Sequence, residues 1–389
     1  MKTFLITDYG VQADDSRLQT KEIQNVLDMC RDGGGTVIIP CGTFYVSSLY
    51  MHSDTTLFLE SGARLIGSEE CDDYEVFPFP EGMVDRSDME MIRQYYGKPW
   101  AEYRRAIISA YCEHNLTIIG EQDSIMDGRN CYDPNGEEGY RGPHGIYFTN
   151  CENITLHGYT IQHTGNFMHQ LDLCKNTTVT NVTCYSGSDA IHLHHCDNTL
   201  IDSCKFHTGD DCIAGIYVTN LLVRRCDLNT SCDVFRIGGV HIHVEDCHIH
   251  GPGIWPHRKT VVRGKHDELP QDQGRHNTIC VMIYFSSVHF PDPEPSHDIV
   301  FRNCLVENVD RFLIYDPADI LEKGTNLVEV SLENVTFIGL DTSSYVRAPE
   351  DNPLQIRMKN VRASFRENAA CTLGLFDGSD PNTHITEEV

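Results

Sequence analysis

The sequence predicts an all-β fold: a single-stranded right-handed parallel β-helix whose N-terminal end is covered by a helix. Three observations predict it. Short runs rich in β-branched residues alternate with Gly, Pro, Asn and Ser along the chain. From residue 151 onward, the same residue types return at intervals close to 22 residues, a period typical of stacked solenoid turns. An acidic position, Asp189, Asp211 and Asp233, also recurs at an interval of 22 residues.

The segment 1–35 is expected to form the N-terminal cap. Apolar residues between 18 and 32 have helical spacing, and Gly33, Gly34 and Gly35 follow as a helix stop. A solenoid has unpaired strand edges at its ends, so a helix at this end would cover one of them. The runs that follow are predicted to be the first strands: Thr36–Pro40, Gly42–Val46, Thr56–Leu59 and Ala63–Gly67.

Two ladders of equivalent residues mark the repeat. We expect the asparagines to stack in tight turns and satisfy backbone groups there. We expect the cysteines to fill the interior as small apolar residues, because the chain contains no Cys-x-x-Cys pair that would indicate a metal site. The ladders are Asn153, Asn176, Asn198 and Asn220, then Cys184, Cys204, Cys226 and Cys247, with weaker copies of the repeat at 298–304, 326–334 and 354–360.

Three irregular stretches interrupt one solenoid domain that spans 1–389. They are 69–105, with a possible short helix near Asp88–Tyr96, and the later stretches 251–277 and 286–297. Long irregular insertions in a compact fold are commonly functional loops, although ordinary packed loops are an equal alternative for the first of them. Together the three could wall in a pocket.

The composition excludes several partners. Thirty Lys+Arg against 57 Asp+Glu give a net charge of -27, which argues against nucleic acid and against an anionic membrane surface. The N-terminal residues reach Asp8 after a very short apolar run, and no stretch is long and apolar enough for a membrane span. Seventeen cysteines in such a chain suggest reduced thiols. We therefore expect a cytoplasmic location; the oligomeric state is not predicted.

The aspartates around residues 186–239 are the candidate chemical site. Stacked turns would bring four carboxylates into one patch, Asp210 included, and like charges so close resist simultaneous ionisation, so at least one should keep its proton near neutral pH. Adjacent residues on a strand point to opposite sides, so we expect Asp210 to diverge from Asp211, at the wide separation that inverting hydrolysis uses. A lone acidic pair in a turn would more often be a solvated or capping pair. The in-register repeat favours function.

The chain resembles glycoside hydrolase family 28, the polygalacturonases and their exo-acting relatives. The resemblance covers most of the chain and is carried by Gly33–Pro40, Ser124–Gly128 and, most specifically, His207–Ala214 with its paired aspartates. It implies a pectin-lyase-like right-handed parallel β-helix and inverting hydrolysis. Carried over by position, it implies that Asp210 is the general acid and that Asp189 with Asp211 holds and activates the water.

The chain departs from the family pattern at several positions. Gly187-Ser188 stands where the family has Asn-Thr, Asp233-Val234 where it has a histidine next to glycine, and His257-Arg258-Lys259 only echoes its carboxylate-gripping Arg-x-Lys element. The expected substrate-binding residues are Asp233, His192, Arg236, Arg258 and Lys259. Arg236, in register with His192 and Ala214, is predicted either to contact substrate or to pair with Asp233. The His-x-His pairs 241/243 and 248/250 have no third ligand recognisable in the sequence, so neither a metal nor a cofactor is expected.

The sequence therefore predicts a glycosidase that hydrolyses an O-glycosidic bond of an imported oligosaccharide with inversion, from a chain end because insertions would close the cleft. One alternative is a hydrolase or transglycosylase of a neutral or fructose-containing sugar. A polysaccharide lyase is less favoured, because such enzymes generally use Ca²⁺ and a basic residue. A further alternative is a non-catalytic carbohydrate-binding or structural β-helix.

Overall fold

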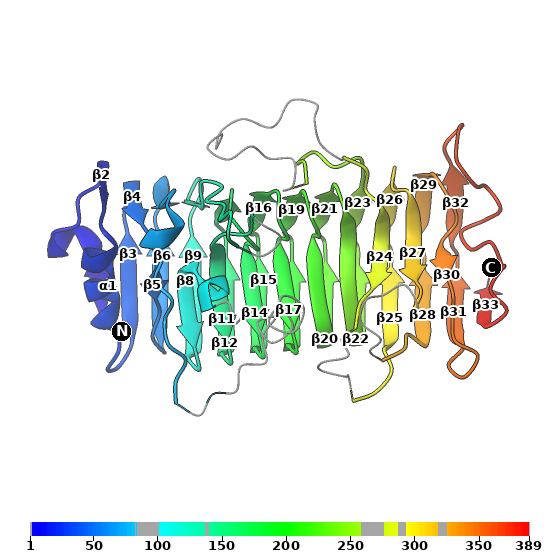
Figure 1. Ribbon diagram of the computed structural model, residues 1–389, viewed down its shortest axis with the longest axis horizontal. Coiled ribbons are helices and arrows are strands. Elements are labelled where there is room, and N and C mark those ends of the chain that lie inside the picture. The colour runs from blue at the N-terminus through cyan, green and yellow to red at the C-terminus, as the bar shows by residue number, and fades with distance from the viewer. Residues whose placement is uncertain are drawn as a thin grey trace.

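The structure, a computed structural model, is a right-handed parallel β-helix, elongated along the axis on which its turns are stacked (Figure 1). It describes residues 2–81, 83, 101–136, 140–257, 276–286, 293–317 and 325–388. Strands of successive turns pair in parallel from β1 at one end to β33 at the other. The predicted fold class is confirmed.

Each turn contributes strands to three parallel sheets. The first sheet, along the top of Figure 1, has 12 strands: β2 (Asp15–Leu18), β4 (Gly42–Val46), β7 (Ala63–Gly67), β10 (Ile125–Asp127), β13 (Thr160–Gln162), β16 (Thr183–Ser186), β19 (Lys205–Thr208), β21 (Asp227–Thr230), β23 (His248–His250), β26 (Leu305–Glu307), β29 (Thr336–Leu340) and β32 (Arg362–Phe365).

The second sheet follows the first along each turn. Its strands are β5 (Leu49–Tyr50), β8 (Ala106–Tyr111), β11 (His144–Thr149), β14 (His169–Asp172), β17 (Ile191–His194), the first parts of β20 (Ile213–Arg224) and β22 (Asp233–Glu245), β24 (Cys280–Tyr284), β27 (Arg311–Tyr315) and β30 (Tyr345–Val346).

The third sheet completes each turn. Its strands are β1 (Thr3–Leu5), β3 (Gly35–Ile39), β6 (Thr55–Leu59), β9 (His114–Gly120), β12 (Glu152–His157), β15 (Lys175–Thr180), β18 (Asp197–Asp202), the second parts of β20 and β22, β25 (His297–Arg302), β28 (Glu329–Glu333), β31 (Leu354–Lys359) and β33 (Thr383–Glu388). The predicted first strands match β3, β4, β6 and β7.

Strands β20 and β22 run through the corner between the second and third sheets without a break. Their pairing register shifts between Gly215 and Val218. At this corner Gly239 has a φ of 145°, and a Cβ there would collide with the backbone of Val218. Glycine is therefore required where the two long strands bend against each other.

The interior is filled by apolar residues that stack from turn to turn, because equivalent positions in successive strands lie one above the other. One such row runs through the third sheet from β3 to β31: Val37, Leu57, Ile118, Leu156, Val179, Ile201, Val223, Val244, Phe301, Leu332 and Met358.

The cysteine ladder is interior, as predicted, but one of its members was misassigned. Cys204, Cys226 and Cys247 are buried and precede β19, β21 and β23 at equivalent positions. Cys184 lies within β16, in register with Phe206. Its place in the ladder is taken by Val182, whose carbonyl accepts a hydrogen bond from the Lys205 N–H in the next turn. The predicted ladder was therefore wrong at Cys184.

The asparagines stack in the turns, but they bond to one another rather than to the backbone. The Asn153 amide donates to Asn115 (3.0 Å), Asn176 donates to Asn153 (3.1 Å) and Asn198 donates to Asn176 (2.8 Å). The ladder ends at Asn220, which donates instead to Asp197 (2.9 Å). All these asparagines have a φ between 54° and 58°. Asn is among the residues that tolerate this left-handed conformation.

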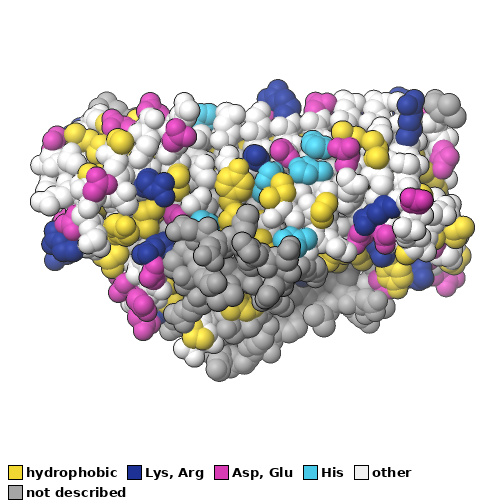
Figure 2. All heavy atoms as spheres, turned by 90° about the horizontal axis from the view of Figure 1, so that it is seen from above, with side chains coloured by type: hydrophobic (Ala, Val, Ile, Leu, Met, Phe, Trp, Pro, Cys, Tyr) yellow, Lys and Arg dark blue, Asp and Glu magenta, His cyan; other side chains and the backbone are white. Residues whose placement is uncertain are grey.

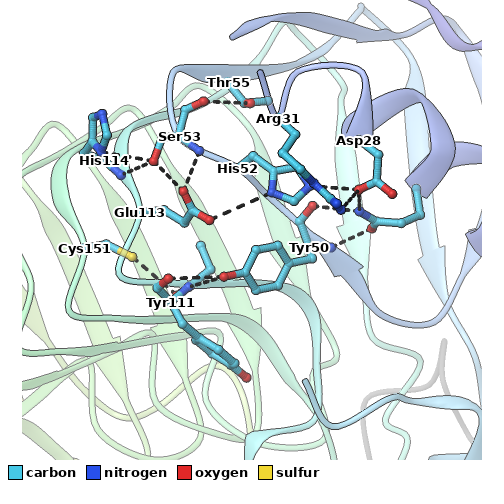
Figure 3. A network of polar contacts seen from close by, with 12 residues as sticks. Asp28, Arg31, Tyr50, His52, Ser53, Thr55, Tyr111, Glu113, His114 and Cys151 are labelled. Atoms are coloured by element: carbon cyan, nitrogen blue, oxygen red, sulfur yellow. Dashed lines mark hydrogen bonds and ion pairs between the residues drawn. The ribbon is translucent and has the colours of Figure 1, made fainter. Parts of the chain in front are cut away.

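The N-terminal cap contains more than the predicted helix. Helix α1 (Thr20–Asp28) follows the strands β1 and β2, which add one pairing row each to the third and first sheets. His52 joins the helix to the solenoid: its Nε2 lies 2.8 Å from Asp28 and its Nδ1 lies 3.9 Å from Glu113 (Figure 3). The cap is thus tied to the body by both backbone pairing and a polar network.

The three predicted insertions are described only in part. The first contains the short 3-10 helices Cys71–Asp73 and Ala101–Arg104, and another 3-10 helix, Ile6–Tyr9, lies in the cap. The helix predicted near Asp88–Tyr96 falls outside the described residues. Among the described helices, none has the length and apolar character needed to cross a membrane.

Candidate active site

Asp189, Asp211 and Asp233 stand one above another on three successive turns, next to the second-sheet strands β17, β20 and β22. The N–H of Ala190 donates to the Asp211 carbonyl (3.1 Å), and the N–H of Cys212 donates to the Asp233 carbonyl (3.3 Å). The column that the 22-residue interval predicted is therefore present.

The column continues beyond the aspartates. Phe167 occupies the equivalent position one turn before Asp189, because His169 pairs with Ile191. Cys280 and then Arg311 occupy it after Asp233. Burial and the Asp233 charge raise the pKa of the Cys280 thiol, which donates a hydrogen bond to Asp233 Oδ1 (3.1 Å). The acidic part of the column thus lies between an aromatic ring and a thiol donor.

Asp210 joins this column instead of diverging from it. One carboxylate oxygen from each of Asp189, Asp210 and Asp211 lies within 4.8 Å of the others. The expected divergence was wrong because residues 209–212 lie in the bend between β19 and β20, where the alternation of strand side chains does not apply. The bend turns two neighbouring carboxylates toward one point.

Burial and mutual repulsion set the electrostatics of this cluster. Asp189, Asp210, Asp211 and Asp233 are 2%, 8%, 4% and 7% exposed. Burial, followed by the charges of Asp189 and Asp233, raises the pKa of Asp211 well above its usual value, although Arg236 and Cys232 partly oppose this shift. Burial and crowding therefore favour the protonated form of Asp211, which is the direction that the sequence predicted for the cluster.

His192 supports the first aspartate of the column. Its Nδ1 lies 2.8 Å from Asp189 Oδ2, and its ring stacks on Phe167 with centroids 4.2 Å apart and planes at 26°. Both the hydrogen bond and the stacking fix the orientation of the imidazole. His192 is therefore placed to orient the Asp189 carboxylate, at the site where the sequence predicted a substrate or proton-handling role.

Arg236 lies in register with Ala214 and His192, as predicted. Its guanidinium carbon lies 3.5 Å from the ring centroid of Phe285. The positive charge is close enough to lower the pKa of Asp211. The contact that fixes this side chain is thus a cation–π contact, which the sequence did not indicate. Arg258 and Lys259 lie outside the described residues.

Two further histidines also shape the site: His257, which the sequence indicated only as part of the His257-Arg258-Lys259 echo, and His169, which it did not indicate. His257 Nε2 lies 3.4 Å from Asp210 Oδ1, and His257 is buried. Its loop packs so closely on Gly209 that a Cβ there would collide with the Pro256 carbonyl. His169 bonds through Nδ1 to the Ala190 carbonyl (2.8 Å), and burial lowers its pKa to about 4, so the neutral ring donates this bond. The repeat spacing could not indicate the role of His257, because residues 251–257 form an irregular segment after β23.

The cluster also contains atoms that could ligate a cation. Three overlapping groups have their ligand atoms within 4.8 Å of one another: Asp189 with Asp210 and Asp211, Asp211 with Cys232 and Asp233, and Asp210 with Cys232 and His257.

Comparison with known proteins finds a family model that matches the region around the aspartates. The model of Glycosyl hydrolases family 28 matches residues 90–232, which include Asp189, Asp210 and Asp211. The Exo-poly-alpha-D-galacturonosidase of Dickeya chrysanthemi is 40% identical over 73 residues, which are 19% of this chain and 12% of that protein. The chain thus covers only a small part of the length of this curated relative.

Solved structures show the same fold over the whole chain. The hyperthermoactive exopolygalacturonase of Thermotoga maritima superposes with a TM-score of 0.73 at 15% identity, covering 100% of this chain and 90% of that one. The family 28 exopolygalacturonase of Yersinia enterocolitica superposes with a TM-score of 0.67 at 17% identity, covering 100% and 77%. Residues 90–232 thus match the model of Glycosyl hydrolases family 28, and the chain shares the parallel β-helix fold of these two exopolygalacturonases.

Proposed function

We propose that the chain is a glycosidase that hydrolyses an O-glycosidic bond of an acidic, pectin-type oligosaccharide from a chain end, with inversion. The observation that carries this proposal is the convergence of Asp189, Asp210 and Asp211, together with the raised pKa of Asp211. Glycoside hydrolysis needs a carboxylic acid and a carboxylate together. Inversion is proposed from the family resemblance of His207–Ala214, because oxygens within 4.8 Å of one another are closer than the roughly 6.5–9.5 Å between carboxyl groups that is usual for inverting enzymes. The names of the matching Dickeya, Thermotoga and Yersinia proteins support exo action on galacturonan.

In the proposed reaction, Asp210 gives its proton to the glycosidic oxygen as the bond from that oxygen to the anomeric carbon breaks. Water attacks the opposite face of the same carbon, and its proton passes to the carboxylates of Asp189 and Asp211. Asp210 is the most exposed of these three aspartates, at 8%. The proton that burial favours on Asp211 in the free protein lies within 4.8 Å of an Asp210 oxygen, so binding of substrate need move it only a short way.

The assignment of the acid is tested with two substrates that differ in their leaving group. An Asp210→Asn protein should hydrolyse an oligogalacturonide about 10³-fold more slowly, because an alkoxide leaving group needs protonation. It should keep much more of its activity on an aryl galacturonide whose phenolate leaves unprotonated. Asp189→Asn and Asp211→Asn should lose activity on both. If Asp211→Asn instead showed the selective retention, Asp211 would be the acid.

Product analysis tests the stereochemistry and the chain-end action. NMR spectra taken in the first minutes should show the anomer opposite to that of the cleaved bond, and a long galacturonan should release only one small product from the outset. Retained configuration, or a ladder of intermediate sizes, would contradict these parts of the proposal. Binding of oligogalacturonide without turnover over days would favour a non-catalytic β-helix. Turnover of neutral oligosaccharides alone would favour the neutral-sugar alternative.

Substrate contacts are proposed for the charged residues around the cluster. Arg236 and His192 flank the aspartates on the second sheet and are candidates for the carboxylate and hydroxyl groups of the sugar. Asp233 is a candidate for hydroxyl groups. Arg258 and Lys259 are candidates from the sequence alone. Arg236→Lys should raise KM for an acidic oligosaccharide more than it lowers kcat, because an ammonium cannot bind a carboxylate bidentately.

We also propose that the protein works in a reducing compartment, such as the cytoplasm, on imported oligosaccharides. Most of the 17 cysteines are buried in the interior of the solenoid, where they fill space as small apolar residues. A thiol titration of denatured protein, prepared from the native cells without reductant, should find 17 thiols per chain. A substantially smaller number would argue for an oxidising compartment.

A further inference from the structure

A second cluster of ligand-type side chains lies on the outer face of the first sheet. His207 is on β19, Asp227 on β21 and His250 on β23, so three successive turns contribute one group each. His207 and His250 share one row of the sheet with Asn229 between them. The ligand atoms of the three residues all lie within 4.8 Å of one another. Figure 2, which views the molecule from the side of the first sheet, shows histidine side chains gathered near mid-length among acidic ones.

The two histidines of this cluster lie at different distances from the Asp227 carboxylate, and only one of them is close enough for a hydrogen bond. His250 Nε2 lies 2.7 Å from Asp227 Oδ1, which is a hydrogen bond. His207 Nε2 lies 3.6 Å from Asp227 Oδ2, which is too far for one. Two ligands on a tetrahedral zinc ion, with bonds near 2.0 Å, stand about 3.3 Å apart. The His207–Asp227 separation is therefore closer to that of two ligands sharing a cation than to that of a donor and acceptor.

The His207 nitrogen gives a second, independent indication of a ligand. His207 is only 6% exposed, and within the described part of the chain its buried Nε2 has no partner at hydrogen-bond distance; the Asp227 carboxylate, at 3.6 Å, is its ion-pair partner. Buried polar nitrogens are normally satisfied, so an orphaned one that faces a carboxylate needs an explanation. A cation between His207 and Asp227 would supply the missing partner.

Solvent reaches one side of the cluster, so a bound cation could keep one coordination position for water. The side chain of Asp227 is 42% exposed, so water can reach the cluster as a fourth ligand. The Asn229 amide donates to the carbonyls of His250 (2.7 Å) and Pro252 (3.0 Å) and holds the chain around His250 in place. His248 stacks on His250 but bonds to Glu307 (2.8 Å), so it supports the ring without joining the cluster.

We propose that His207, Asp227 and His250 form a site for a divalent transition-metal cation of the zinc class. Two imidazoles and one carboxylate suit Zn²⁺ and its first-row neighbours and do not suit Mg²⁺ or Ca²⁺, which prefer oxygen ligands. Binding displaces the His250 Nε2 proton that is now shared with Asp227. The ligands come from three turns at unequal spacing, so the His248-x-His250 pair alone could not reveal the site. The bound cation cross-links β19, β21 and β23.

Calorimetric titration of the tag-free protein with Zn²⁺ tests this site. All variants carry Cys41→Ser and Cys112→Ser, because these two thiols are exposed and could bind the cation themselves. We expect binding of one equivalent, weakened at least about tenfold in His207→Ala and in Asp227→Asn, and a Tm that rises with Zn²⁺ only where the site is intact. Mg²⁺ should give no heat at this site.

His243→Ala is the matched control. His243 and His241 also bond to one carboxylate, Asp298, but through the same oxygen Oδ2 (3.2 and 2.7 Å), so that oxygen is already occupied. This variant should bind Zn²⁺ like the parent. Unchanged stoichiometry and affinity in Asp227→Asn, which keeps the shape of the side chain, would overturn the proposal. If His207→Ala fails to fold by circular dichroism, Asp227→Asn and His250→Gln decide the outcome.

Discussion

Asp211 shows how a single residue can serve the proposed chemistry at a cost to the fold. Its pKa is raised well above the usual value by burial and by the charges of Asp189 and Asp233. The unfolded chain has no such environment, so the folded state binds this proton more tightly than the unfolded state does. Stability therefore falls as pH rises above the pKa of an unfolded Asp, about 3.9.

This linkage predicts the effect of Asp211→Asn on stability. The amide cannot ionise, so the folding stability of the variant does not fall with pH in this way. The variant should therefore gain stability relative to the parent as pH rises from 4 to 8. We expect a Tm advantage at pH 8 that exceeds that at pH 4 by about 2–4 °C, measured by differential scanning fluorimetry. Asp32→Asn, at an exposed position after α1, should show equal small effects at both pH values. A relative loss for Asp211→Asn at high pH would contradict the raised pKa.

At the scale of elements, the asparagine ladder stabilises the same bend in successive turns of the solenoid. Each Asn combines a left-handed backbone with an amide that bonds to the turns before and after it, so one residue type satisfies both requirements. The two contributions can be separated because glycine tolerates the backbone conformation and alanine does not.

Asn176 is the position that separates them. Asn176→Ala loses both amide hydrogen bonds and adds left-handed strain, so it should lower the free energy of unfolding by about 1–2 kcal/mol. Asn176→Gly loses the same hydrogen bonds without the strain and should lower it by less. Urea unfolding followed by circular dichroism measures both, with Lys175→Ala as the exposed control. Equal losses in the two Asn176 variants would show that backbone conformation contributes nothing.

The junction of α1 with the solenoid predicts a pH-dependent cap. Burial lowers the pKa of His52, but the neighbouring carboxylates of Glu113 (3.9 Å) and Asp28 (2.8 Å), both drawn in Figure 3, outweigh burial and raise the pKa overall. The stabilisation from this ion pairing is complete below the pKa of an unfolded His, about 6.5, and is lost as pH rises through the raised value. The same contacts lower the pKa of Asp28 and Glu113, so the pairing is lost again at low pH.

His52→Gln should therefore lower the Tm by more at pH 5.5 than at pH 8.5, with a difference of about 1–3 °C. The comparison of the two pH values isolates the charge, because the loss of packing is the same in both. His384→Gln, on the exposed strand β33, should leave the Tm unchanged at either pH. A larger loss at pH 8.5 would mean that His52 is neutral in the folded protein.

The sequence predicts elements best where the turns have equal length. Asp189, Asp211 and Asp233 could be aligned because the strands between them are regular, and the alignment is confirmed. Cys184 was misplaced because an interval of 20 residues was accepted in place of 22, the interval that leads to Val182. The expected divergence of Asp210 and Asp211 failed because strand alternation was applied to a bend. The contact of His257 with Asp210 could not be predicted, since an irregular loop brings the two residues together.

At the scale of the whole molecule, the charge of the solenoid opposes its proposed substrate. The net charge is -27, and the site itself is a cluster of buried aspartates. An acidic oligosaccharide is therefore repelled at long range and attracted only on close approach to groups such as Arg236. Salt screens the first effect more than the second, because the Debye length falls from about 30 Å at 0.01 M to about 8 Å at 0.15 M.

Ionic strength should therefore improve capture of an acidic substrate. We expect kcat/KM for an oligogalacturonide to rise about two- to fivefold between 0.01 M and 0.15 M NaCl, mainly through KM, because screening removes repulsion during approach. The rate for a neutral aryl glycoside, or for a methyl-esterified oligogalacturonide, should stay constant and is the control. A fall in kcat/KM for the acidic substrate would show that local positive charge governs its approach. In that case positive charge close to the aspartates, such as that of Arg236, would outweigh the charge of the molecule as a whole.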